Sequence, residues 1–84
     1  MHDLHVADRI LKLVLESAAK NKLSKVTKIS VDLGSVVEHG EEINPDNLKF
    51  NLLMLAEGTL AEKTQIKIGK IHGESWNLKE IEGE

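Results

Sequence analysis

The spacing of apolar residues along this 84-residue chain switches between a helical period and a strand period. Apolar residues repeated every three or four positions predict amphipathic helices, whereas strict alternation predicts strands with one buried face. The resulting order is helix, strand, helix, strand, strand. The predicted helices cover 4–21 and 44–57, and the predicted strands cover 26–33, 64–71 and 75–82. A chain with this order has few ways to bury its apolar surface in one core.

Both predicted helices carry an apolar stripe and recognisable boundary residues. Asp3 is placed to act as the N-cap of the first helix. In the second helix Asn44 can cap, Pro45 suits the first position, and Gly58 can take the left-handed conformation that ends it. The predicted buried stripes are Ala7, Ile10, Leu11, Val14 and Ala18 in the first helix, and Leu48, Leu52, Leu55 and Ala56 in the second.

These elements predict an α+β fold, a two-layer sandwich with two helices on one face of a mixed three-stranded sheet. The strand–helix–strand crossover makes the first two strands parallel. Only a short turn around His72 and Gly73 separates the last two strands, so we expect them to form an antiparallel hairpin. Residues 35–43 are polar and irregular, and we expect a loop there. The remaining sheet face, with Ser30, Asp32, Gln65 and Lys67, is expected to contact water.

Composition excludes several classes of protein. The formal net charge is −3 with both signs interspersed, so the chain lacks the basic face of a nucleic-acid binder. It contains no cysteine, which excludes a disulfide framework and a cysteine-ligated zinc site. Its apolar runs are too short to span a membrane, and its start lacks a signal-peptide pattern. We therefore expect a single cytoplasmic domain over 1–84, with no nucleic-acid or membrane partner.

The opening residues MHD have the composition of a metal site. Methionine aminopeptidases favour a small second residue, so His2 should leave Met1 in place. The Met1 α-amine and the His2 backbone nitrogen and imidazole can then chelate one ion through a five-membered and a six-membered ring. Three coplanar nitrogens suit Ni(II) or Cu(II), and Asp3, water or another imidazole can supply the fourth ligand. The simpler interpretation is that Asp3 only caps the helix and that His2 lies near the start by chance.

The sequence resembles the HypA family of nickel metallochaperones for hydrogenase and, in some organisms, urease maturation. The resemblance rests on MHDL at the start, VTKISVDLG in the first strand, PDNLKF…LAEGTLAE through the second helix, and LKEIEGE at the end. It covers most of the chain, and His2 stands at the family's functional position. Two small departures are Asp3, where the family usually has Glu, and Ser35, where many members carry an acidic residue.

The resemblance implies Ni(II) at Met1, His2 and Asp3, and delivery to a hydrogenase precursor or a nickel-handling GTPase. Family members also carry a zinc domain with two CxxC pairs between the last two strands. Here a short turn near 70–75 stands in its place, so we expect a nickel-binding domain alone and no zinc. A homo-oligomer is compatible with the sequence.

Other histidines and one tryptophan are weaker candidates. His5 can add a ligand, and His39 lies in an acidic loop, but solvent exposure explains both equally well. We interpret His72 as a turn residue and Trp76 as core or edge packing. No nucleophile–base pair or phosphate-binding glycine loop is visible, so we expect no enzyme. The competing function is a metal-free adaptor module that keeps the fold.

Overall fold

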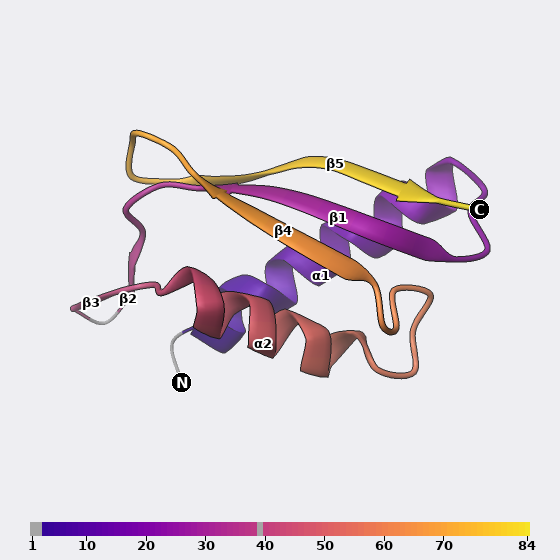
Figure 1. Cartoon of the computed structure of the whole chain (residues 1–84), viewed down its shortest axis with the longest axis horizontal. Coiled ribbons are helices and arrows are strands. Elements are labelled where there is room, and N and C mark those ends of the chain that lie inside the picture. Colours follow the sequence, from indigo (N-terminus) through magenta and orange to yellow (C-terminus); the bar gives the residue numbers. More distant parts are fainter. Residues whose placement is uncertain (1–2, 39) are drawn as a thin grey trace.

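A central strand, β1 (Val26–Leu33), pairs with one strand on each side in a three-stranded sheet. The computed structural model describes residues 3–38 and 40–84. β4 (Gln65–Lys70) runs parallel to β1, with Ile29 opposite Ile66, and β5 (Trp76–Gly83) runs antiparallel to it. The helices α1 (Asp3–Lys20) and α2 (Pro45–Ala56) lie together against one face of the sheet (Figure 1). The predicted two-layer α+β sandwich is confirmed.

The predicted hairpin between the last two strands is wrong. The strand order is β4-β1-β5, so both strands bond to β1 rather than to each other. The chain after β4 crosses the end of β1 and returns along its other side (Figure 1). Residue spacing gives the length of a connection but does not fix which edge of the sheet the next strand joins. The parallel pairing of β1 with β4 is confirmed.

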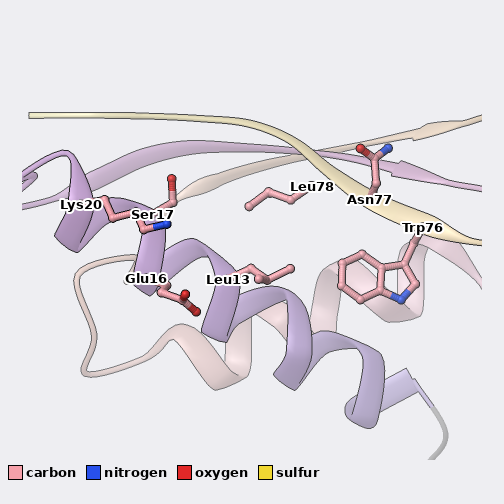
Figure 2. Close-up of a pocket in the computed structure, with 7 residues that line it drawn as sticks. All are labelled: Leu13, Glu16, Ser17, Lys20, Trp76, Asn77 and Leu78. Carbon is pink, nitrogen blue, oxygen red and sulfur yellow. The ribbon is translucent and has the colours of Figure 1, made fainter.

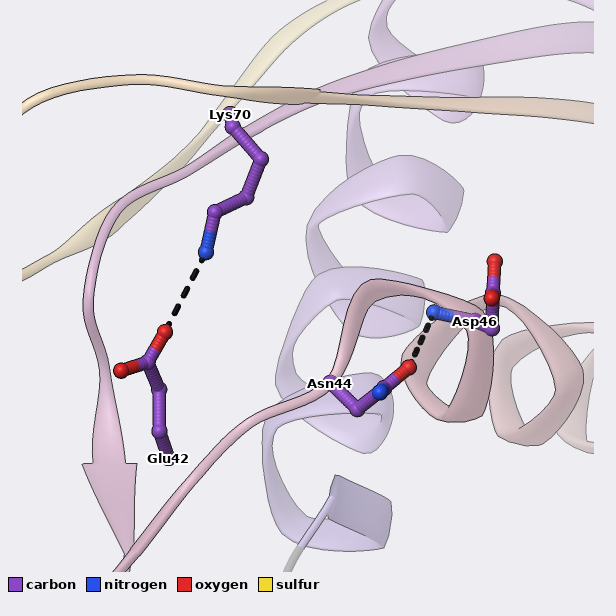
Figure 3. A network of polar contacts seen from close by, with 4 residues as sticks. All are labelled: Glu42, Asn44, Asp46 and Lys70. Atoms are coloured by element: carbon purple, nitrogen blue, oxygen red, sulfur yellow. Dashed lines mark hydrogen bonds and ion pairs between the residues drawn. The ribbon is translucent and has the colours of Figure 1, made fainter.

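Both predicted helices form, with small changes at their ends. α1 begins at Asp3, so Asp3 is its first residue rather than the cap before it. In α2 the Oδ1 atom of Asn44 accepts hydrogen bonds from the backbone N–H groups of Asp46, at 2.8 Å, and Asn47, at 3.3 Å (Figure 3). Gly58 has φ +80° just beyond the helix. The predicted cap of α2 at Asn44 and its end at Gly58 are therefore confirmed.

The core lies between the helices and the sheet. All five residues of the predicted α1 stripe are buried, as are Leu48, Leu52 and Ala56 of α2, while Leu55 is half-buried. Ile29, Val31 and Leu33 contribute the β1 side of this core. On the opposite face Gln65 and Lys67 are exposed, as expected, whereas Ser30 is buried because the strands on both sides flank it.

Residues 35–43 are not entirely a loop. Two very short strands, β2 (Val37–Glu38) and β3 (Glu41–Glu42), pair antiparallel as a small ribbon. The Lys70 ammonium at the end of β4 lies 3.3 Å from the Glu42 carboxylate, which links the ribbon to the sheet (Figure 3).

The connection from β4 to β5 is bonded to the end of β1 by backbone hydrogen bonds. The N–H of Gly34 donates to Ser75 O at 2.8 Å, Ser35 N–H to Gly73 O at 2.8 Å, and Ile71 N–H to Leu33 O at 3.0 Å. This short segment is therefore an ordered part of the fold, and it fixes where β5 begins.

Candidate functional site

The predicted metal site lies at the very start of the chain, and two of its three residues, Met1 and His2, lie outside the described residues. Asp3 is described as the first residue of α1. The structure does describe the helix that follows Met1 and His2. Val6, Ala7 and Ile10 are buried in the core within the first two turns of α1, so the beginning of the helix is attached firmly to the domain.

The beginning of α1 lies at the same end of the molecule as the first turn of α2 and the β2–β3 ribbon (Figure 1). His5 is exposed on α1, as expected for a polar surface position. Glu42 of the β2–β3 ribbon lies at this end and already pairs with Lys70. His39 of the acidic loop lies outside the described residues.

Within residues 3–38 and 40–84, no three His, Cys, Asp or Glu side chains gather closely enough to hold a metal ion. His72 is exposed in the β4–β5 connection, consistent with its interpretation as a turn residue. None of the helices in the described part of the chain is both long and apolar enough to cross a lipid bilayer.

A second surface feature lies between α1 and β5, which we call the α1–β5 groove. Its lining residues are Leu13, Glu16, Ser17, Lys20, Trp76, Asn77 and Leu78, around a volume of about 480 Å³. Figure 2 shows Leu13 from the helix and Trp76 and Leu78 from the strand facing the same space. An adjoining hollow of about 200 Å³ shares Leu13 and Trp76 and adds Arg9 and Lys12.

Trp76 connects these two hollows. Its indole ring is half-buried, and the Arg9 guanidinium carbon lies 6.0 Å from the ring centroid, within the range of a cation–π contact. The sequence placed Trp76 correctly in edge packing but did not identify the groove. The sequence holds one signal of the groove, because Leu13 is apolar yet lies off the predicted buried stripe of α1. In the structure Leu13 is 43% exposed.

Comparison with known proteins shows the family to which the chain is related. Residues 1–78 match the family model described as hydrogenase/urease nickel incorporation, metallochaperone, hypA. The chain belongs to the HypA family. It is 35% identical over 71 residues to the hydrogenase maturation factor HypA of Methanobrevibacter smithii, covering 84% of this chain and 54% of that protein. It is 32% identical over 78 residues to the HypA of Rhizobium leguminosarum, covering 93% and 66%.

The fold agrees with a solved HypA. The solution structure of the Ni metallochaperone HypA from Helicobacter pylori superposes with a TM-score of 0.77 at 14% identity, covering 99% of this chain and 97% of that chain. This likeness establishes the HypA fold. The chain spans between about half and two thirds of the length of the two curated relatives above.

Proposed function

We propose that this HypA-family chain carries Ni(II) at its N-terminus and passes it to a hydrogenase maturation pathway. The Met1 amine, the His2 amide nitrogen and the His2 imidazole would be the ligands, with the Asp3 carboxylate as the fourth. The observation that carries the proposal is the family match from residue 1, which includes the MHD start. Coplanar nitrogen ligands suit Ni(II).

The start of α1 supports the use of a backbone amide as a ligand. The first N–H groups of a helix have no acceptor inside the helix, so an amide ahead of Asp3 can lose its proton without breaking the helical ladder. A dication there meets the positive end of the helix dipole. The amide anion and the Asp3 carboxylate bring two negative charges that offset this repulsion. Asp3 would therefore stabilise the bound ion even if a water molecule were the fourth ligand.

The partners and the non-catalytic role are part of the same proposal. A hydrogenase precursor or a nickel-handling GTPase would receive the ion, and the chain itself would catalyse no reaction. We propose no resident zinc, because the sequence contains no cysteine to form two CxxC pairs. We infer that 1–84 acts as a nickel-binding domain and that residues 70–75 replace the zinc domain. The cytoplasmic location stays a prediction.

The decisive test compares two histidine variants in a sample whose first residue is verified as Met1 by mass spectrometry. His2→Ala should abolish tight Ni(II) binding in isothermal titration calorimetry. His5→Ala, which changes an exposed helix residue three positions later, should retain it. Equal nickel binding by wild type and His2→Ala would refute the proposed site.

A metal-free adaptor is the second candidate, because the α1–β5 groove offers a surface for another protein chain. This function predicts partner capture by the His2→Ala variant and no nickel binding above background by wild type. The carrier function predicts tight nickel binding by wild type.

A further inference from the structure

The α1–β5 groove adjoins an unpaired strand edge. Among residues 3–38 and 40–84, β5 is an outer strand that pairs with β1 along its inner edge, and the N–H and C=O groups of its outer edge have no strand partner there. An outer edge of this kind can accept an extended segment of another chain as an additional strand. The groove lies directly beside this edge, where the side chains of such a segment would be placed.

The usable part of the edge is its beginning. The pairing of β5 with β1 is regular from Trp76 to Leu78, opposite Leu33 and Val31, and then shifts register so that Glu80 lies opposite Ser30. A register shift of this kind interrupts the edge and protects it from continuous pairing. Residues 76–78 also line the groove, so the regular edge and the groove coincide.

The groove combines apolar lining with positive charge at its rim. Leu13, Trp76 and Leu78 supply the apolar lining. Arg9 and Lys20 of α1 supply cations, whereas the Lys12 ammonium already pairs with the Asp8 carboxylate at 3.0 Å. Glu16 is the acidic residue of the lining. With Lys12 paired to Asp8, the rim keeps two cations, Arg9 and Lys20, against one carboxylate, Glu16, in a chain whose formal net charge is −3. The complementary partner therefore has apolar side chains at its centre and acidic side chains at its ends.

We propose that the α1–β5 groove binds an extended acidic–apolar segment of a partner protein, which adds to β5 as a strand. Arg9 and Lys20 are about 16 Å apart along α1 at 1.5 Å per residue. An extended segment covers this span in about five residue steps, and acidic residues six positions apart share one face and reach about 20 Å, enough to meet both cations. The proposal concerns a surface separate from the N-terminal metal site and does not depend on nickel binding.

The position of the groove gives such a partner access to the start of α1. Arg9 lies about 9 Å along α1 from Asp3, at 1.5 Å per residue. A segment bound with one end at Arg9 therefore holds its parent protein near Asp3, the first residue of α1.

The probe is a synthetic peptide, acetyl-Glu-Thr-Leu-Thr-Val-Thr-Glu-amide, titrated into the whole chain. In a strand, alternate residues share a face, so Leu and Val would enter the groove and both Glu residues would meet the rim. The chain's single tryptophan is Trp76, so its fluorescence reports on the groove directly. We expect a saturable shift of Trp76 emission and changes in the amide resonances of 76–78. A peptide with both Glu replaced by Lys should bind at least 10-fold more weakly.

Substitutions at two residues of similar exposed fraction distinguish binding in this groove from nonspecific binding to apolar surface. Leu13 is 43% exposed and Leu60 is 41% exposed, so both accept a polar replacement without loss of the core. Leu13→Glu should lower the affinity for the peptide at least 10-fold, and Leu60→Glu should leave this affinity unchanged. Equal weakening by both variants, or resonance changes centred on Phe50 of α2, would overturn the proposed site.

Backbone methylation tests the added strand itself. Two versions of the peptide, N-methylated at alternating residues, differ only in which edge keeps its N–H groups. One pattern should abolish binding and the other should preserve it, because only one edge of the added strand faces β5. If both bind equally, strand addition is wrong. If the chain forms dimers that Leu13→Glu disrupts, the groove is an interface between two copies, and the partner proposal fails.

Discussion

Gly34 lies where β1 ends, and its missing side chain lets two backbone segments meet. A Cβ atom at this position would lie 2.6 Å from Gly73 O and 2.8 Å from Ser75 O. Both neighbours are backbone atoms held by hydrogen bonds to Gly34 and Ser35, so they cannot move away cheaply. We predict that Gly34→Ala lowers the free energy of unfolding by about 1–3 kcal/mol, measured by urea denaturation.

Gly69→Ala provides the matched control in the same sheet. There the nearest atom to a new Cβ is Asp32 Oδ1 at 3.9 Å, an ordinary contact. Alanine also reduces the entropy of the unfolded chain, so this variant should be neutral or more stable by roughly 0.5 kcal/mol. A loss equal to that of Gly34→Ala would mean that close backbone approach is not the reason.

The proposed nickel ligands make binding depend on pH. A model α-amine titrates near pH ~8 and a histidine near ~6.5, and both must lose a proton before they bind metal. The amide proton must also leave. Affinity should therefore fall steeply as pH decreases from about 7.5 to about 6. Calorimetric titration across this range measures the effect, and an unchanged affinity would exclude the amine and imidazole as ligands.

A tag of several residues added before Met1 provides a second check on the same chemistry. The tag converts the Met1 amine into an amide nitrogen and moves the free amine several residues away from His2, so the three-nitrogen set of amine, His2 amide and His2 imidazole can no longer form. We predict that a tagged chain loses tight binding and that removal of the tag back to Met1 restores it. Tight binding of one Ni(II) by the tagged chain would contradict the proposed geometry.

At the scale of single residues, the sequence identified the nickel candidates but not the groove. The MHD start is contiguous, so ring size and ligand type can be worked out without a fold. The α1–β5 groove instead joins Leu13 to Trp76, which lie far apart in the sequence and meet only because β5 occupies one particular edge. No local pattern contains that information.

Among the elements, α2 has the clearest local signals, and its cap can be tested alone. The Asn44 side chain satisfies two N–H groups that the helix leaves without acceptors. Asn44→Ala should reduce the free energy of unfolding by about 1 kcal/mol. Asn44→Asp should retain most of the stability, because its carboxylate accepts the same bonds and favours the helix N-terminus. Thermal unfolding monitored by circular dichroism separates the two variants, and equal losses would indicate that the hydrogen bonds contribute little.

The helices were easier to predict than the pairing of the strands. Helical period, Asn44, Pro45 and Gly58 are local signals, and each takes its expected place. Strand pairing depends on which edge of β1 remains free after β4 has paired, and this is decided by the whole chain. A hint was available, since Val26, Ile29, Val31 and Leu33 make β1 the most apolar of the three strands, as expected for a strand flanked on both sides.

For the whole molecule, the important consequence of the order β4-β1-β5 is that the β4–β5 connection spans a strand instead of forming a tight turn. Its backbone anchors are Gly34 to Ser75, Ser35 to Gly73 and Ile71 to Leu33. Additional residues between His72 and Gly73 would leave all three bonds in place. Doubling a flexible loop costs only about 0.6 kcal/mol. The molecule therefore has a built-in position for an insertion that leaves its core unchanged.

We predict that six Gly/Ser residues inserted between His72 and Gly73 lower the free energy of unfolding by less than about 1 kcal/mol. The same insertion between Gly34 and Ser35 should lower the free energy of unfolding considerably more. It separates two N–H groups that both donate hydrogen bonds to the β4–β5 connection. Urea denaturation of both variants gives the comparison, and preserved amide resonances of β1 and β5 in the first variant would show that the sheet is intact. Equal destabilisation would mean that the connection is required at its present length, and that a longer segment at this point in a related protein needs a different arrangement of β5.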